Sequence, residues 1–262
     1  PQLTINNNFF GTAATEWGNS VVLPSSSVTG VCVSYGNETA VNVKYNDFRG
    51  MNFKPGSMSA IYLDDTAVVN NVTNITGNTF TNLSVTCPYL NLITFIALQG
   101  SNAIRNIDSN KTVGAFSFDG TTFEMISIYD YTGVGLQTTI SDNEFSNATL
   151  KIVEFDFNYA AVITDGYPSK TKLIHHNKIS NVNLTGGIFA GILYSATFIS
   201  LTDTSKITSN EITNVTVNGL WNFGILIASS LNKVVSDNKI SNLSLSRAAA
   251  PALSLCFRDL FY

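Results

Sequence analysis

The sequence predicts an all-β fold, a right-handed parallel β-helix (a solenoid) of about eight coils with about 33 residues per coil. Two observations lead to this prediction. One short motif returns along the whole chain at a nearly constant spacing, and apolar and polar residues alternate with a period of two in the stretches between its copies. Such alternation is typical of β-strands, and no long segment shows the 3.6-residue period of a helix.

The motif is an apolar residue, two further residues, Asn, one residue, Ile or Phe, one residue and a second Asn. It reads ITGNTFTN from Ile75, ISDNEFSN from Ile140 and ITSNEITN from Ile207. Starting at Asn8, the first Asn of each copy advances by 38, 32, 32, 33, 34, 33 and 28 residues. Regular self-similarity of this kind defines a repeat architecture, so residues 1–262 are treated as one β-helix repeat domain.

The repeat also predicts which residues stack. Short strands are not stable alone, so equivalent strands of successive coils must pair at a spacing of about 4.8 Å. The Ile or Phe of the motif then forms an apolar column, and the first Asn forms a hydrogen-bonded ladder at a corner, because Asn tolerates the left-handed backbone that a sharp bend needs. A second apolar column is expected from Ile192, Ile225 and Leu253. The first column comprises Phe48, Phe80, Phe145, Ile179, Ile212 and Ile240, and the corner ladder comprises Asn46, Asn78, Asn110, Asn143, Asn177, Asn210 and Asn238.

With these columns in place, the chain resembles the pectin-lyase-like superfamily of right-handed parallel β-helix repeat proteins. The resemblance extends over essentially all of the sequence and concerns the repeat motif. It implies the fold and leaves the function open, because the superfamily includes lyases, hydrolases, phage tailspikes, adhesins and surface proteins.

Composition and charge exclude several partners. Charged residues make up 12% of the chain, about half the usual share, and 30 asparagines help to supply the polar surface instead. The net charge is −4 and no basic patch occurs, so nucleic acid is not an expected partner. The most apolar stretch, residues 186–201, is interrupted by Gly, Ser and Thr, so no membrane span is expected. The cysteines Cys32, Cys87 and Cys256 show neither metal-ligand spacing nor a closed disulfide set.

Aspartates at strand ends are the candidates for catalytic residues. Asp64, Asp130 and Asp165 each follow the same strand of the repeat and are expected along one edge, where paired carboxylates could serve hydrolysis. However, no Lys or Arg falls near them or near Asp65 and Asp203 in the sequence, and aspartates at strand ends commonly form turns. We therefore predict no catalytic residues and no cofactor, with a polysaccharide lyase or hydrolase as the alternative.

Two further groups bear on binding. His175 and His176 are adjacent, and in a strand they would point to opposite faces, so no metal site is predicted. Exposed aromatic side chains can stack on sugars, which keeps carbohydrate binding as an alternative. The aromatic candidates are Trp17, Trp221, Tyr129, Tyr131 and Tyr159.

Nine Asn-x-Ser/Thr sequons are the strongest signal apart from the fold. Glycosylation at some of them would place the protein outside the cell or on its surface. Four of the nine coincide with the second Asn of the motif, and an Asn buried in a ladder cannot accept a glycan. The candidates are Asn37, Asn71, Asn74, Asn82, Asn110, Asn147, Asn183, Asn214 and Asn242.

The ends suggest how such a chain would be used. Solenoids usually need capping segments, and none is evident before Ile5 or in the apolar final residues 252–262. Hence we expect either a piece of a longer solenoid or ends that are covered by other copies. The leading expectation is an extracellular, glycosylated structural β-solenoid that partners itself end to end in a filament, or forms a surface stalk or adhesin. A glycan-binding or polysaccharide-degrading protein is the alternative.

Overall fold

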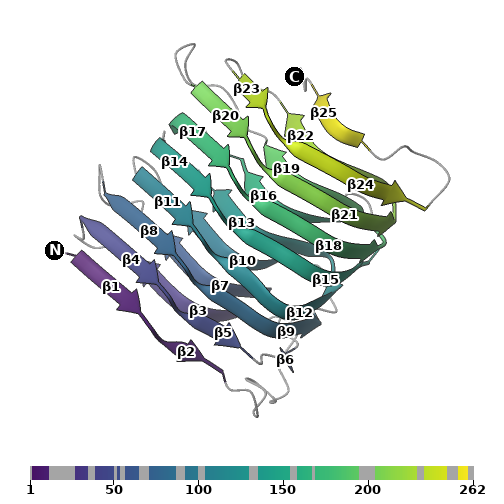
Figure 1. Ribbon diagram of the computed structural model, residues 1–262. Helices are drawn as coiled ribbons and strands as arrows, with labels where there is room; N and C mark the ends of the chain where they lie inside the picture. Colours follow the sequence, from purple (N-terminus) through teal and green to yellow (C-terminus); the bar gives the residue numbers. More distant parts are fainter. Residues whose placement is uncertain are drawn as a thin grey trace.

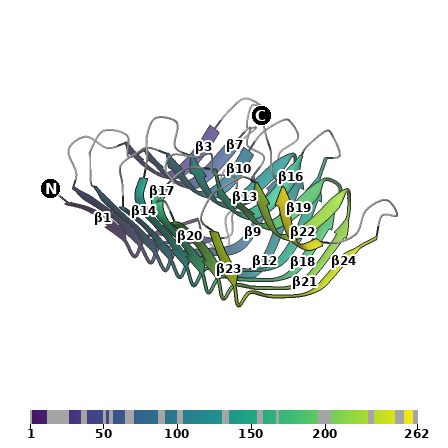
Figure 2. The same cartoon turned by 90° about the horizontal axis from the view of Figure 1, so that it is seen from above.

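The structure is a computed structural model. It describes residues 2–11, 27–34, 39–49, 52–53, 57–64, 71–86, 92–99, 104–129, 135–153, 158–166, 169–194, 204–228, 233–246 and 253–258. These residues contain no helix and form three parallel sheets that wind around a common core (Figure 1). Successive coils contribute successive strands to each sheet, and Figure 2 shows them following one another along the solenoid.

Each sheet takes one strand from each of eight described coils, as the repeat predicts. Sheet A consists of β1 (Gln2–Asn6), β4 (Ala40–Lys44), β8 (Val72–Thr76), β11 (Ile104–Asp108), β14 (Gly135–Ser141), β17 (Ser169–His175), β20 (Thr204–Thr208) and β23 (Lys233–Ser236). Sheet B consists of β2 (Phe9–Phe10), β5 (Asp47–Arg49), β9 (Thr79–Thr86), β12 (Lys111–Gly120), β15 (Glu144–Ile152), β18 (Lys178–Thr185), β21 (Glu211–Asn218) and β24 (Lys239–Leu245), with the short β6 (Asn52–Phe53) also paired to β9. Sheet C consists of β3 (Ser27–Ser34), β7 (Ser57–Asp64), β10 (Leu92–Gln99), β13 (Thr122–Tyr129), β16 (Tyr159–Asp165), β19 (Ile188–Tyr194), β22 (Trp221–Ala228) and β25 (Leu253–Arg258).

Apolar columns from all three sheets fill the interior. Because a strand turns alternate side chains inward, equivalent inward residues stack coil upon coil and remove a continuous apolar surface from water. The column of sheet A runs through Val43, Ile75, Ile107, Ile140, Ile174 and Ile207, all buried. The column of sheet C runs through Val31, Ile61, Ile96, Ile126, Ile163, Ile192 and Ile225, all buried.

The column predicted for sheet B has one interruption. Phe48 pairs with Phe80, and Phe145 pairs with Ile179, which pairs in turn with Ile212. Between these two groups, however, the partner of Phe80 is Thr112. The room left by this small side chain is taken by three aromatic rings from neighbouring inward positions, at centroid distances of 4.6–5.9 Å from Phe80, Phe145 or one another. These rings belong to Phe95, Phe116 and Phe123.

The second predicted column is wrong at its last member. Ile192 pairs with Ile225, but the partner of Ile225 is Leu255, and Leu253 pairs with Phe223. The prediction assumed a constant offset from the ladder asparagine. That offset fails because the connection from β24 to β25 is longer than the one from β21 to β22, which shifts the register by two residues.

The corner between sheets A and B is built on the asparagine ladder. Each ladder residue donates from its backbone N–H and from Nδ2 to the Oδ1 of the ladder residue in the next coil. The distances from Asn78 to Asn110 are 3.0 and 2.9 Å, and those from Asn110 to Asn143 are both 3.0 Å. The ladder continues without a break from Asn8 to Asn238. Nδ2 also donates to a backbone carbonyl of the preceding coil, as from Asn78 to Val43 at 2.9 Å.

The left-handed backbone at this corner belongs to a different residue from the one predicted. The residue directly before each ladder asparagine has a positive φ, for example 56° at Ser109 and 55° at Asp142. The ladder asparagine follows the bend, which turns its side chain inward. The second Asn of the motif also takes the left-handed conformation, at φ 57° for Asn147 and 55° for Asn214.

We predict that Asn78→Ala lowers the free energy of unfolding by about 3 kcal/mol or more. The variant leaves the buried donors of Asn46, the carbonyl of Val43 and one acceptor of Asn110 short of partners, and each such group costs about 1–3 kcal/mol. Urea unfolding followed by circular dichroism measures the effect.

Asn106→Ala is the matched control, because Asn106 lies in a half-buried outer row of sheet A and donates to Asn74 at 2.9 Å. We expect a loss of about 1 kcal/mol or less for this variant. Equal losses for the two variants would contradict a special role for the buried ladder.

Candidate functional site

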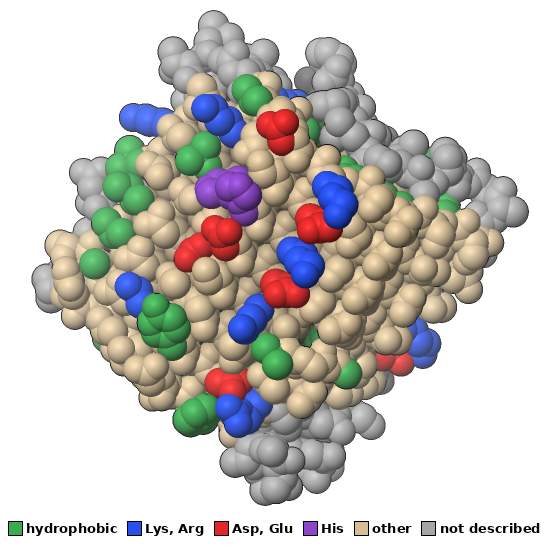
Figure 3. Space-filling model, viewed as in Figure 1, with side chains coloured by type: hydrophobic (Ala, Val, Ile, Leu, Met, Phe, Trp, Pro, Cys, Tyr) green, Lys and Arg blue, Asp and Glu red, His purple; other side chains and the backbone are tan. Residues whose placement is uncertain are grey.

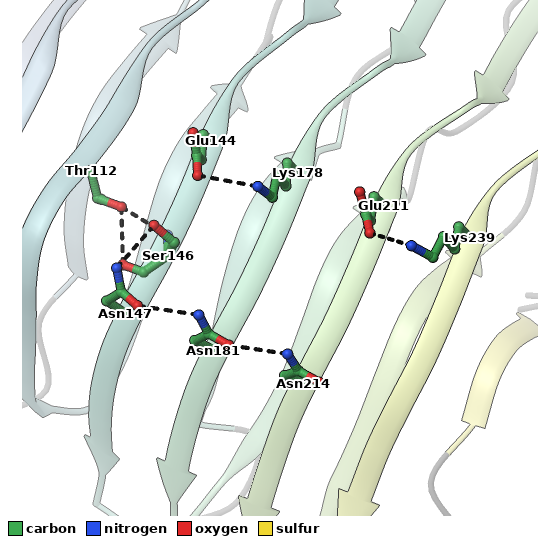
Figure 4. A network of polar contacts seen from close by, with 9 residues as sticks. All are labelled: Thr112, Glu144, Ser146, Asn147, Lys178, Asn181, Glu211, Asn214 and Lys239. Carbon is green, nitrogen blue, oxygen red and sulfur yellow. Dashed lines mark hydrogen bonds and ion pairs between the residues drawn. The ribbon is translucent and has the colours of Figure 1, made fainter.

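A row of alternating charges follows the outer face of sheet B, just after the corner. Because equivalent outward residues also stack, the row runs straight along the solenoid and is visible as an alternating blue and red stripe in Figure 3. Lys178 lies 3.7 Å from Glu144, and Lys239 lies 2.7 Å from Glu211 (Figure 4). The row comprises Lys111, Glu144, Lys178, Glu211 and Lys239.

The charge row affects the ionisation of Glu211 near its C-terminal end. The hydrogen bond from Lys239 and its positive charge lower the pKa of Glu211 below its ordinary value of 4.5. Since the folded-state pKa is lowered, the stabilisation is present above the unfolded-state pKa and is lost as the pH falls through the folded-state value. Solvent screens exposed pairs of this kind, so the row contributes more to register than to stability.

A row of amides runs parallel to the charges. Asn181 donates to Asn147 at 3.3 Å, and Asn214 donates to Asn181 at 3.2 Å (Figure 4). Asn242 continues the row and donates to Asn214 at 2.9 Å. All four side chains are exposed. The next outward row contains hydroxyls and one amide, at Thr149, Asn183, Thr216 and Ser244. From β18 to β24, the two rows line a shallow uncharged hollow.

The asparagines of the predicted sequons differ in their solvent exposure. Asn71 and Asn110 are both 0% exposed, and the side chain of Asn110 is enclosed in the corner ladder, so neither is accessible in the folded chain. Asn74 is half-buried and bonded to Asn42 and Asn106, and Asn37 lies outside the described residues. Exposed sequon asparagines are Asn82, Asn147, Asn183, Asn214 and Asn242, all in outer rows of sheet B.

A groove of about 350 Å³ lies on the outer face of sheet C, over β7, β10 and β13. Five of its nine lining residues carry a hydroxyl group, and Tyr62 Oη donates to Oε1 of Gln99 at 2.7 Å. The lining residues are Ser57, Ser59, Tyr62, Leu92, Thr94, Ala97, Leu98, Gln99 and Ser127.

Several buried polar atoms on this face have no protein partner. Thr94 Oγ1 and Ser127 Oγ belong to the groove, and Glu124 Oε2 and Thr164 Oγ1 lie on the adjoining strands. The other oxygen of Glu124 accepts a hydrogen bond from Tyr159 Oη at 2.6 Å. Buried polar atoms in proteins are nearly always paired, so four unpaired oxygens on one face are unusual.

The expectation that no basic residue lies near the candidate acids was wrong. Lys172 Nζ lies 2.6 Å from Oδ1 of Asp165, with side-chain exposures of 1% and 0%. The two residues face each other because the chain turns between sheet C and sheet A. Lys172 also lies 4.7 Å from the ring centroid of Tyr194, whose hydroxyl is 2.7 Å from Ser205 Oγ. This enclosed pair has no access for a polymer and serves to tie the two sheets together.

The remaining acids do not form a catalytic cluster in the described part of the chain. Asp64 ends β7 and is half-buried, and Asp65, Asp130 and Asp203 lie outside the described residues. Among the residues that the structure describes, no three carboxylates lie close enough to share one ligand. Among the aromatic candidates, Trp221 stacks on Phe223 with ring centroids 5.7 Å apart, and Tyr159 is half-buried and donates to Glu124. Trp17, Tyr131 and the side chain of Tyr129 lie outside the described residues.

The histidines differ most from the prediction. His175 ends β17, but His176 has a φ of 56°, so the strand alternation that would separate the two rings stops between them. Their Nδ1 atoms lie 2.8 Å apart. Asp142, at the same corner of the preceding coil, contributes a carboxylate to this group. The signal available in the sequence was the alignment of His176 with the bend position of the motif.

Comparisons with known proteins give no relative for this chain. No protein-family model, curated protein or solved structure matches it. The described residues include no helix with the length and apolar character needed to cross a bilayer. The fold thus defines the class, a parallel β-solenoid protein, and any function must be argued from its own surfaces.

Proposed function

We propose that this chain is a structural β-solenoid of the extracellular space or cell surface, which assembles end to end with copies of itself and bears glycans on sheet B. The observation that supports this proposal most directly is the direction of the corner ladder. Each ladder residue from Asn46 to Asn210 donates to the ladder asparagine of the next coil and accepts from that of the preceding one, so the ladder has direction.

The two ends of the described ladder are complementary. Oδ1 of Asn238 accepts from the backbone N–H and Nδ2 of Asn210 at 3.0 and 2.9 Å. The backbone N–H of Asn238 is the group that, in earlier ladder residues, donates to the next coil. Asn8 donates to Asn46, and its Oδ1 takes the place at which later residues accept. A head-to-tail contact between copies would continue the ladder, and a heterologous contact that does not close generates a filament.

Apolar side chains at the end coils favour the same contact. The inward residues of the end coils are only partly buried, whereas the equivalent residues of the central coils are buried. Phe10 stacks on Phe48 at 4.6 Å, and another coil placed against it would continue the column. Covering such residues removes apolar surface from water. They are Leu3, Ile5 and Phe10 at one end, and Val235, Ile240, Leu243 and Leu245 at the other.

The outer face of sheet B supports a location outside the cell. Its exposed sequons lie in uncharged rows beside the charge row, and in a chain with only 12% charged residues glycans would add solubility. A glycosylated Asn keeps one N–H on Nδ2, so Asn214 could still donate to Asn181 within the amide row. The superfamily resemblance is retained here at the level of the repeat, supported by the three sheets and the corner ladder.

The glycosylation proposal predicts a specific occupancy pattern. In protein secreted from a glycosylating host, peptide mapping by mass spectrometry should find glycans at Asn147, Asn183 or Asn214, which are exposed. Asn71 and Asn110 should be unmodified, because both are enclosed. A folded product that has glycans at Asn110, or none at any exposed sequon, would contradict the proposal.

End-to-end assembly predicts that each end can be blocked separately. Ile240→Lys at one end and Phe10→Lys at the other should each abolish filaments, because a charge would be buried at the contact. Mixed in equal amounts, the two variants should form dimers through their unblocked ends. Negative-stain microscopy and sedimentation velocity measure the states.

Thr216→Lys, on the exposed outer face of sheet B, is the matched control and should assemble as the unaltered chain does. Circular dichroism checks that every variant is folded. A monodisperse, unaltered chain at all concentrations would contradict the proposal, and so would a mixture of the two variants that yields no dimer.

A second function, glycan binding in the groove of sheet C, is favoured by its unpartnered Thr94 and Ser127 hydroxyls. If oligosaccharides bind there, Thr94→Val and Ser127→Ala should each weaken binding about tenfold, the equivalent of one hydrogen bond. A glycan array identifies a ligand and calorimetry measures its affinity. Thr149→Val, on sheet B, should have no effect. An array with no bound glycan, or equal losses for all three variants, would exclude this site.

A further inference from the structure

We propose that Asp142, His175 and His176 form a surface binding site for a divalent transition metal ion, with Cu²⁺ bound more tightly than Ni²⁺ or Zn²⁺. The site lies in the middle of the solenoid at the corner between sheets A and B. It is independent of the end contacts, the glycans and the groove. Among the described residues, this is the one group of three His, Cys, Asp or Glu side chains whose ligand atoms lie together, all within 4.8 Å of one another.

The backbone of the corner brings these side chains together. Asp142 and His176 occupy the same left-handed bend position in adjacent coils, at φ 55° and 56°, so their side chains leave the corner side by side. The backbone N–H of Asp142 donates to the carbonyl of His175 at 3.3 Å, which fixes the carboxylate-bearing residue next to the imidazoles. Imidazole nitrogen and carboxylate oxygen together are ligands that divalent transition metals prefer.

The distance between the imidazole nitrogens indicates the preferred geometry. Metal–nitrogen bonds of about 2.05 Å place two cis nitrogens about 2.9 Å apart at a right angle and about 3.3 Å apart in a tetrahedron. The observed Nδ1–Nδ1 distance of 2.8 Å is that of a hydrogen bond between the two rings, and a metal bound at a right angle could replace the shared proton with little movement of either ring. Square-planar or tetragonal nitrogen and oxygen coordination is characteristic of Cu²⁺ and Ni²⁺, and affinity at such sites is highest for Cu²⁺.

The surroundings add negative charge and leave the site open. His176 and Asp142 are exposed, and Figure 3 shows the histidines as a surface patch with acidic side chains beside it. Asp108 belongs to the outer row that continues through Ser141 to His175, and it accepts hydrogen bonds from Ser141 Oγ at 2.9 Å and Ser109 Oγ at 3.0 Å. Its carboxylate is thus held near the site, where it favours a cation.

Calorimetry with CuCl₂, NiCl₂ and ZnCl₂ in a weakly coordinating buffer tests the site. We expect one Cu²⁺ per chain, weaker Ni²⁺ and Zn²⁺ binding, and an electron paramagnetic resonance spectrum of bound Cu²⁺ with hyperfine structure from two nitrogens. His175→Ser and His176→Asn should each weaken Cu²⁺ binding by about a hundredfold, and Asp142→Asn by about tenfold.

Each substitution introduces a residue that another coil already has at the same position. Ser141 is equivalent to His175, and Asn7 occupies the same bend position as His176 and Asp142, so the corner should still fold. Asp237→Asn is the matched control, because Asp237 occupies the bend position of the last coil with no histidine near it in the described residues. Undiminished Cu²⁺ binding by His176→Asn, an equal loss with Asp237→Asn, or a spectrum without nitrogen coupling would overturn the proposal.

Discussion

The buried hydrogen bonds between ladder asparagines are the interaction on which the rest of the structure depends. A primary amide has two donors and two acceptor sites, and in a closed interior all of them need partners. Asn110 meets this requirement only when Asn78, Asn143 and the carbonyl of Ile75 are each in register. A slip of one residue in a single coil would leave buried donors unpaired in two neighbours. The ladder therefore fixes the register that hydrophobic columns alone, made of interchangeable Ile, Val and Phe, would specify only weakly.

The chemistry of the outer surface follows from that register. Once the inward residues are stacked, the outward residues are stacked as well, and any position can become a row or a local cluster. Opposite charges alternate from Lys111 to Lys239, amides bond side to side from Asn147 to Asn242, and two histidines meet an aspartate at one corner. Such sites need no deep cleft, because neighbouring coils supply ligands about 4.8 Å apart.

Features that repeat with the period of the coil could be predicted from the sequence, whereas contacts between different sheets within a coil could not. The spacing of asparagines was enough to predict the coils, the corner ladder and most of the apolar column. It could not show that Phe116 and Phe123 take the place of a ring at Thr112, because side chains of sheets B and C share that space. Nor could it show that Lys172 meets Asp165, since the ion pair forms across the turn between sheet C and sheet A, where the repeat has no fixed length.

The histidine group shows that the bend position of the motif determines where a side chain points. The expectation that the two rings point to opposite faces assumed continuous strand geometry, yet the motif places a bend directly before each ladder asparagine. That bend accepts Asn, Tyr, Gly, Ser, Asp or His in different coils, all with positive φ. Only the ladder residue behind it is constant, because its side chain is enclosed whereas the bend residue projects outward. The solenoid can thus change the chemistry of one coil at this position without disturbing the hydrogen bonds that hold the next coil in place.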